Sequence, residues 1–293
     1  MPKLTAGILG GGKWGTSLGQ RLNGSCDVKI YDRDSQPDMA VLRDSDLIVV
    51  AVPSFAIREV ISAFKPFYSG QPVVGISKGL EKETGLLSNQ IIEEIFGGIR
   101  YAHLSGPSFA DEVSRGLPTM LSLALTNFGH QKYFQNIIDL QDLRIQLTED
   151  LIGVQLGGAL KNVIAIAAGV SDALLCGENA RAMLMIQGLQ ETVLLGKKLG
   201  AREETFFGPS GLGDLILTAT SRQSRNYRLG VQLVENSQNN KSEMIKSDTF
   251  EGASTAAGAY FLARKFNLKL PLIEGVYKII YENKTPGSLL KEI

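Results

Sequence analysis

One lysine in this chain has surroundings suited to moving a proton. Lys161 lies in a run of Gly, Ala, Val and Ile, where partial loss of solvent would lower its pKa toward the range of a working acid or base. Asp214 and Thr218 are four residues apart, so a helix would place both on one face, where they could orient that lysine. The alternatives are a lysine whose stem covers an apolar helix and an ordinary surface pair. We expect Lys161, Asp214 and Thr218 to be catalytic.

Two other groups of polar residues suit an anionic ligand. Ser224, Arg225 and Asn226 offer a hydroxyl, a bidentate guanidinium and an amide, which together suit a phosphate. Lys78 follows an apolar run that we interpret as a strand, at the edge where sheets of parallel strands bind ligands, so it could reach both substrate and cofactor. For the first group a plain polar loop is the alternative.

A glycine-rich turn near the start of the chain is typical of dinucleotide binding. Gly10-x-Gly12-x-x-Gly15 follows a strand-like run and precedes a helix-compatible one, which is the context that this pattern requires. The amides at such a helix start can bind a pyrophosphate. Trp14, the only tryptophan, could belong to the core, but its place in the turn favours contact with the cofactor. The expected cofactor contacts in this turn are Gly10, Gly12, Lys13, Trp14 and Gly15.

The residues about 20 positions beyond this turn bear on the choice of cofactor. Asp32 would bind the hydroxyls of the adenine ribose and favour NAD, whereas Arg33 could hold the 2′-phosphate of NADP. Both could instead be solvated residues at a strand end. The pair leaves NAD and NADP open, with NADPH slightly favoured.

The order of apolar runs predicts an α/β fold with a helical second part. Runs that are apolar on both faces, with gaps long enough for crossovers, indicate a Rossmann-like, doubly wound, mostly parallel sheet. Small residues in 151–175, and Met183, Ile186, Leu189 and Val193 at helical spacing, predict an all-α domain. We place the boundary between residues 147 and 148, and expect a polar loop at 235–241. The expected strands are Leu4–Leu9, Val28–Tyr31, Leu47–Val52, Val73–Ile76, Tyr101–Leu104, Met120–Leu125 and Arg144–Leu147.

Composition excludes several classes of partner. The 30 basic and 30 acidic residues among 293 balance, which argues against nucleic acid or an anionic membrane as partner. Cys26 and Cys176 lack the spacing of metal ligands and favour a reducing, cytoplasmic compartment. We see no signal peptide and no apolar run long enough to insert in a membrane. With His103 and His130 the only histidines, we expect no metal.

The motifs together resemble bacterial-type NAD(P)-dependent sn-glycerol-3-phosphate dehydrogenases nearly from end to end. The resemblance implies reversible reduction of dihydroxyacetone phosphate by NADPH or NADH, supply of glycerophospholipid synthesis, and a homodimer. The chain departs from the family between Asp32 and Val52, which is short here, and in carrying an acid at Asp32. The motifs are GGGKWGTSLG, AVPS, SKGLE, SGPSFADEVSRGLPT, GALKNVIAIAAG, GLGDLILTATSRQSRN and FEG.

The resemblance also implies roles for residues that the pattern alone leaves open. It makes Lys161 the acid or base, places Gly106 and Ser108 against the substrate and Ala110 on the nicotinamide side, and makes Glu251 a cofactor contact. Without it, Ser105–Ser108 could be a simple turn and Glu251 a cap or surface residue.

Two other functions remain as alternatives. Another two-domain Rossmann dehydrogenase, acting on a hydroxy acid or sugar acid, would also need lysine and arginine for its carboxylate ligand. A catalytically silent NAD(P)-binding sensor is the second alternative, and the presence of Lys161 and Asp214 argues against it.

Overall fold

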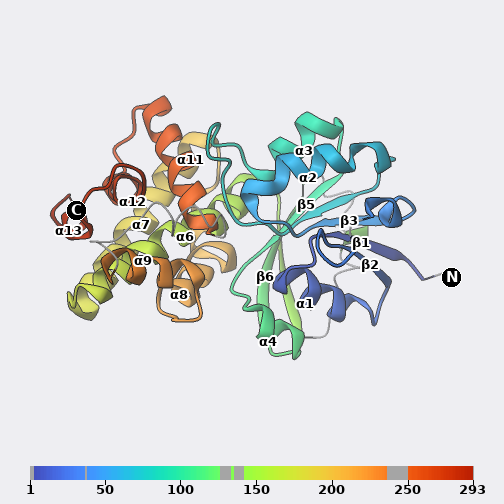
Figure 1. Cartoon of the computed structure of the whole chain (residues 1–293), viewed down its shortest axis with the longest axis horizontal. Helices are drawn as coiled ribbons and strands as arrows, with labels where there is room; N and C mark the ends of the chain where they lie inside the picture. The colour runs from blue at the N-terminus through green and yellow to red at the C-terminus, as the bar shows by residue number, and fades with distance from the viewer. Residues whose placement is uncertain (1–2, 37, 126–132, 135–141, 236–249, 293) are drawn as a thin grey trace.

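The strands form one sheet in the N-terminal half of the chain. A computed structural model describes residues 3–36, 38–125, 133–134, 142–235 and 250–292. Within them a seven-stranded sheet has the order β2-β1-β3-β4-β5-β6-β7, and only the β5–β6 pair is antiparallel. The predicted Rossmann-like, mostly parallel sheet is confirmed (Figure 1). The strands are β1 (Thr5–Leu9), β2 (Asp27–Tyr31), β3 (Leu47–Val50), β4 (Val73–Gly75), β5 (Tyr101–Ser105), β6 (Thr119–Leu125) and β7 (Leu143–Thr148).

Two apolar layers cover the two faces of this sheet. On one face Leu18 and Leu22 of α1 (Lys13–Leu22) pack on the strands, with α4 (Ala110–Ser114) beside α1. On the other face α2 (Ile57–Phe64) and α3 (Ser88–Phe96) lie together. Because both faces are buried, the inner strands are apolar throughout, as β3 shows. Figure 1 shows α2 and α3 above the sheet and α1 and α4 below it.

A long central helix organises the C-terminal half. Almost all residues of α6 (Leu151–Ala173) are buried, and Asp150 caps its start by accepting a hydrogen bond from the Gly153 amide (2.9 Å). Glycines let α9 approach α6 closely, since a side chain at Gly169 or Gly230 would meet the backbone of the other helix. The surrounding helices are α7 (Gly177–Leu199), α8 (Asp214–Ala219), α9 (Arg225–Glu235), α11 (Glu251–Phe266), α12 (Pro271–Tyr281) and α13 (Leu289–Glu292).

The apolar character of α6 bears on one expectation. We expected no uninterrupted apolar run long enough to cross a membrane, and Gln155, Lys161 and Asn162 do interrupt α6, although its 23 residues are long and apolar enough on average to pass a test of length and composition. However, 89% of its most apolar window is buried inside the protein. Burial among neighbouring helices explains the composition, since a core helix is apolar all round.

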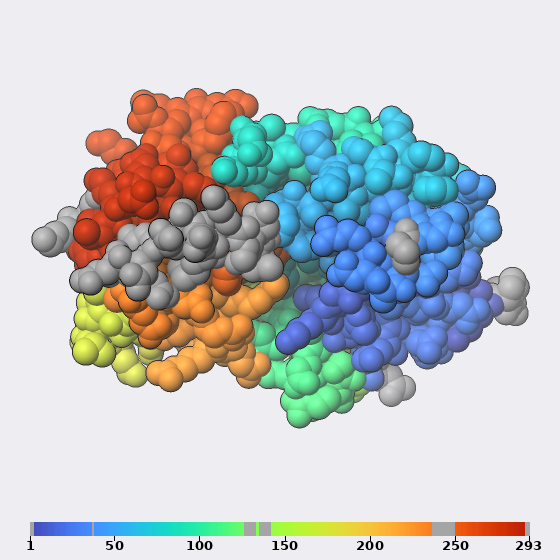
Figure 2. Space-filling model, viewed as in Figure 1, coloured from blue at the N-terminus to red at the C-terminus, as the bar shows by residue number. Residues whose placement is uncertain are grey.

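The two halves lie side by side (Figure 2). Helix α6 of the C-terminal half contacts β5 and β6 of the sheet. β7 ends at Thr148 and α6 begins at Leu151, and the division into domains at residues 147 and 148 stays a prediction. The polar loop expected at 235–241 lies outside the described residues apart from Glu235, which ends α9.

Candidate active site

One carboxylate joins two lysines from the two halves of the chain. Asp214, at the first position of α8, accepts a hydrogen bond from Lys161 Nζ at Oδ1 and one from Lys78 Nζ at Oδ2 (2.7 Å). Thr218, one turn further along α8, accepts from Lys161 Nζ at 2.9 Å. All four side chains are buried. The spacing of Asp214 and Thr218 therefore does place both against Lys161.

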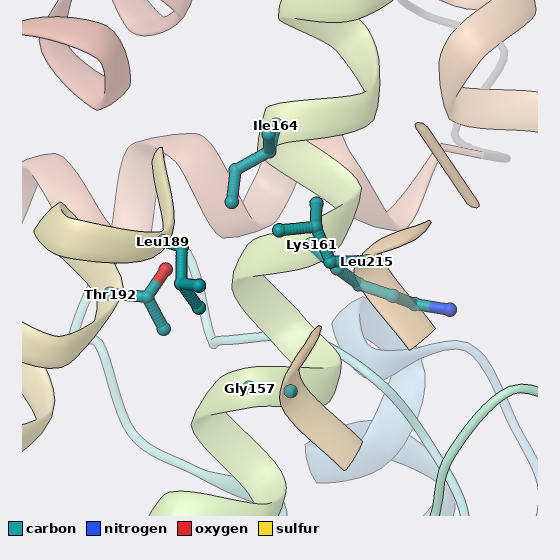
Figure 3. A pocket seen from close by; sticks show the side chains of 7 residues that line it. Gly157, Lys161, Ile164, Leu189, Thr192 and Leu215 are labelled. Carbon is teal, nitrogen blue, oxygen red and sulfur yellow. The ribbon is translucent and has the colours of Figure 1, made fainter. Parts of the chain in front are cut away.

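The environment of Lys161 lowers its pKa. Burial lowers its pKa to about 8, while the negative charge of Asp214 opposes the shift and the positive charge of Lys78 adds to it. A void of about 10 Å³ adjoins Lys161 and is otherwise lined by Ile164, Leu189, Thr192, Leu215 and two glycines. Figure 3 shows the lysine nitrogen pointing away from Leu189 and Thr192. The apolar surroundings thus enclose the stem, and the ammonium has its partners on the other side.

Lys78 lies at the carboxyl edge of the sheet, three residues after β4. Its Nζ donates to the Gly106 carbonyl (2.8 Å) and approaches Ser108 Oγ at 3.5 Å. Ser108 donates to the same carbonyl (2.9 Å). Asn162, next to Lys161 on α6, donates from Nδ2 to the Lys78 carbonyl (3.0 Å), which fixes the backbone of one lysine to the helix of the other. The structure therefore brings Lys78, Gly106 and Ser108 to the Asp214 cluster.

The start of α9 presents groups suited to an anion. Ser224 accepts a hydrogen bond from the Tyr227 amide (3.2 Å), so this hydroxyl caps the helix. The side-chain oxygen of Asn226 accepts a hydrogen bond from the Gly252 backbone amide (3.1 Å). The side-chain nitrogen of Asn226 therefore remains to donate to a ligand. The exposed Arg225 has no hydrogen-bond or ion-pair partner among the described residues. A helix start with an unpaired guanidinium favours a negative ligand.

Glu251 connects this helix start to the sheet. It begins α11 and accepts a hydrogen bond at Oε1 from the Ser54 amide (3.2 Å), which lies just beyond β3. Burial raises its pKa, and the positive charges of Arg225, Lys161 and Lys78 act in the opposite direction. Glu251 is partly buried, and its carboxyl binds the backbone beyond β3 rather than capping α11.

The glycine-rich turn has the shape that a pyrophosphate needs. Gly10 has φ +115°, and a Cβ there would lie 2.8 Å from the Ala51 backbone, whereas the space beside Gly12 is open. Gly12 precedes α1 and no side chain caps that helix, so its first amides are free to bind an anion. The indole nitrogen of Trp14 is buried and has no hydrogen-bond partner among the residues that the structure describes. These residues fit the pyrophosphate of a dinucleotide.

The two residues proposed to read the adenosine end differ in their surroundings. Asp32, just after β2, lies against Gly11 of the glycine-rich turn. Arg33 is 86% exposed, and its nearest carboxylate is Asp34 at 3.7 Å. Lys13 is also exposed, at the start of α1, and Ala110 begins α4. Arg33 and Lys13 therefore make no contact with the Asp214 cluster.

Sequence reasoning missed several residues that assemble the site. Asn162 served only as part of a motif, and neither Ser54 nor Thr255 was singled out. The Thr255 hydroxyl accepts from the Leu80 amide (3.3 Å) and so ties α11 to the segment that follows Lys78. Contacts between residues so far apart in the chain leave no local pattern. In the described part of the chain, no group of three or more His, Cys, Asp or Glu residues could hold a metal ion.

Comparison with known proteins identifies the family. Models of the N-terminal and C-terminal parts of NAD-dependent glycerol-3-phosphate dehydrogenase match residues 36–130 and 150–291. A glycerol-3-phosphate dehydrogenase [NAD(P)+] from Maridesulfovibrio salexigens is 36% identical over 98% of this chain and 96% of its own length. This chain belongs to the NAD-dependent glycerol-3-phosphate dehydrogenase family. The relative from Thioalkalivibrio sulfidiphilus is 39% identical over 94% of this chain and 92% of its own.

Solved structures agree with this assignment. The crystal structure of glycerol-3-phosphate dehydrogenase from Coxiella burnetii has a TM-score of 0.91 and 34% identity, and covers 99% of this chain and 98% of its own. A ketopantoate reductase from Ralstonia eutropha covers 98% of this chain and 99% of its own at 12% identity with a TM-score of 0.63, and so shares the fold alone. The family that the motifs resemble is thus confirmed, and a hydroxy-acid dehydrogenase is not favoured.

Proposed function

We propose that this protein is an oxidoreductase that reversibly reduces dihydroxyacetone phosphate to sn-glycerol 3-phosphate with NAD(P)H. Membership of the family supports the reaction, and one observation supports the site. Two ammonium groups, Lys161 and Lys78, share the single carboxylate of Asp214 at the carboxyl edge of the sheet. One positive charge is left uncompensated where a ketone oxygen gains negative charge during reduction.

Lys161 is the proton donor in this proposal. A nicotinamide cofactor, when bound, would supply the hydride that the carbonyl carbon needs. Lys161 Nζ gives one proton to the carbonyl oxygen as that oxygen becomes a hydroxyl, and the neutral amine then takes a proton from solvent. A pKa of about 8 leaves the lysine protonated yet able to release its proton near neutral pH. In the oxidation direction the neutral amine accepts the hydroxyl proton.

Asp214 and Thr218 hold the lysine in place for this step. Both accept hydrogen bonds from Nζ, so two of the three donors of the ammonium are directed and the third remains for the substrate oxygen. Lys78 adds positive charge from the sheet edge, where Gly106 and Ser108 surround it. We assign Lys78, Gly106 and Ser108 to substrate binding.

The phosphate of the substrate is assigned to the start of α9. Arg225 offers an unpaired guanidinium, and Asn226 offers its amide nitrogen because its carbonyl oxygen is already bonded to Gly252. Ser224 caps the helix through its oxygen, which leaves its hydroxyl hydrogen to donate. The electric dipole of α9 adds to the attraction for a phosphate dianion.

We assign the cofactor to the glycine-rich turn and the cleft edge beside it. The free amides before α1 would hold the pyrophosphate, and Lys78, Ala110, Arg225 and Glu251 would line the nicotinamide side. Glycerophospholipid synthesis as the use of the product, a homodimer and a cytoplasmic location are further parts of the proposal. Light scattering of the purified protein tests the dimer.

Steady-state oxidation of NADH and NADPH, in parallel, tests the reaction. We expect turnover with dihydroxyacetone phosphate, and loss of turnover in Lys161→Ala. Activity on a 2-keto acid such as ketopantoate, with none on dihydroxyacetone phosphate, would favour the hydroxy-acid alternative. Binding of cofactor without turnover of any ketone would favour the sensor.

A further inference from the structure

The end of β2 continues into a tight hairpin closed by a bridge between Asp32 and Gln36. The Asp32 amide donates to the Gln36 carbonyl (3.1 Å), and the Gln36 amide donates back to the Asp32 carbonyl (2.8 Å). The chain then reaches β3 at Leu47. These two bonds fix the backbone of Asp32, so the direction of its side chain is set by the turn that it starts.

Three hydrogen bonds hold one oxygen of the Asp32 carboxylate. Oδ1 accepts from the Asp34 amide (3.2 Å), the Ser35 amide (3.1 Å) and the Ser35 hydroxyl (3.1 Å). The Ser35 amide is the main reason that the pKa of Asp32 lies below its usual range. The carboxylate therefore stays ionised and in one orientation.

The other oxygen of this carboxylate faces the glycine-rich turn. A Cβ built on Gly11 would lie 2.8 Å from Asp32 Oδ2, so the carboxylate packs directly on the backbone of that turn. Gly11 lies between β1 and the start of α1, where the first amides are uncapped. Oδ1 takes the three bonds of the hairpin, and the Gly11 amide is a further hydrogen-bond donor to this carboxylate that also lowers its pKa.

Arg33 lacks comparable support. Its side chain is 86% exposed, and its only ion-pair partner among the described residues is Asp34, itself 87% exposed, at 3.7 Å. Nothing directs the guanidinium toward the glycine-rich turn. A free arginine loses side-chain entropy when it is ordered on a phosphate, whereas the Asp32 carboxylate is already in place.

We propose that Asp32 makes this protein select NAD(H) over NADP(H). Its fixed carboxylate would accept hydrogen bonds from the hydroxyls of the adenine ribose and would repel a phosphate at the 2′ position. The slight preference for NADPH inferred from Arg33 is thereby reversed. The inference rests on the proposed function only in that the chain binds a nicotinamide dinucleotide; it does not depend on the substrate.

Equilibrium binding of NADH and NADPH, measured by titration calorimetry without substrate, tests the inference. We expect the wild-type protein to bind NADH at least about tenfold more tightly than NADPH, since a bond to a charged acceptor is lost and like charges meet. Asp32→Asn keeps an oxygen for the three hairpin bonds but removes the charge. It is expected to reduce the ratio of the two dissociation constants by about tenfold or more, mainly by improving NADPH binding.

Asp34→Asn is the matched control, because it removes one negative charge from the same hairpin but away from Gly11. We expect it to change the ratio by less than about threefold, since an exposed charge is screened. Arg33→Ala should likewise leave NADPH binding within about threefold, which tests the view that Arg33 does not hold a 2′-phosphate.

The outcomes separate this inference from the proposed function. Equal binding of the two dinucleotides, tighter binding of NADPH, or a loss of NADPH binding in Arg33→Ala would each overturn the role of Asp32 and leave the reaction standing. Binding of neither dinucleotide would overturn both. A comparison of 5′-ADP with 2′,5′-ADP as ligands repeats the test at the adenosine end alone, and tighter binding of 2′,5′-ADP would contradict the proposal.

Discussion

Replacing Lys161 by methionine is predicted to stabilise the folded protein while abolishing its activity. The lysine is buried on α6, and its pKa is lowered from 10.5 in the unfolded chain to about 8. Keeping this ammonium charged at neutral pH therefore lowers the free energy of unfolding. Methionine has a similar length and no charge, and it would lie along the same apolar stem environment beside Ile164 and Leu215.

The size and pH dependence of this effect follow from the pKa shift. A shift of one unit corresponds to about 1.4 kcal/mol, so the drop from 10.5 to about 8 corresponds to about 3 kcal/mol. Because the folded pKa of this lysine is lowered, the cost is full below about pH 8 and disappears as the pH rises to about 10.5. Asp214 keeps Lys78 as partner at 2.7 Å, so the variant leaves no unpaired buried carboxylate.

Urea unfolding of both proteins between pH 7 and pH 10 measures the difference in the free energy of unfolding. We expect Lys161→Met to be more stable by up to about 3 kcal/mol near pH 7, with the difference shrinking above about pH 8. Lys198→Met, at an exposed position of α7, is the control and should stay within about 0.5 kcal/mol of wild type. A difference that stays constant across this pH range, or a variant less stable at pH 7, would refute the reasoning. Turnover should fall at least about 100-fold.

Three further substitutions test other parts of the structure. Arg225→Ala should raise the KM for dihydroxyacetone phosphate about 100-fold and lower turnover of unphosphorylated dihydroxyacetone much less; equal losses on both ketones would argue against a phosphate contact. Glu191→Ala should lower the free energy of unfolding by about 2–4 kcal/mol, because its buried carboxylate accepts two backbone amides at the start of α12 (2.8 and 3.0 Å); a change below about 0.5 kcal/mol in urea unfolding would contradict this. Gly169→Ala should cost more than about 2 kcal/mol, since the new methyl meets the Tyr227 carbonyl, whereas Gly287→Ala, with open space around it, should cost less than about 1 kcal/mol by the same assay.

The architecture was predictable from the sequence because a strand that is buried on both faces is a continuous run of apolar residues. Inner strands such as β3 are apolar at every position, and the glycine-rich turn marks where β1 ends. The antiparallel β5–β6 pair carries no comparable signal, because strand direction depends on the path of the connecting chain. Periodicity likewise predicted α7 but not its buried face: Met183 and Ile186 are exposed, whereas Leu184 and Leu195 are buried. Packing against α6 and α12 decides which face is covered.

The site was predictable where its residues share one element and unpredictable where two elements meet. The spacing of Asp214 and Thr218 was enough to place both on one face of α8, and they contact Lys161. The hydrogen bond between Lys78 and Asp214 joins residues 136 positions apart, so no short sequence motif could have predicted it. Ser224 shows a different limit. Its residue type suits a phosphate, but the same hydroxyl also caps α9, and only the structure distinguishes these uses.

The shared carboxylate explains why the two halves of the site depend on each other. Lys78 comes from the sheet and Lys161 from α6, and without Asp214 their ammonium groups would repel each other in a buried place. Asn162 strengthens the same junction by binding the Lys78 backbone. Since one carboxylate serves two cations, the pocket keeps a positive charge that is held by bonds formed before any ligand arrives. In the proposed reaction such preorganised charge would stabilise a developing oxyanion without reorganising the protein. Burial of the Lys161 ammonium, with a smaller contribution from the charge of Lys78, is what makes this lysine costly to keep protonated. The buried ammonium of Lys161 thus both destabilises the fold and serves as the proposed proton donor. Lys161→Met is therefore expected to remove both effects.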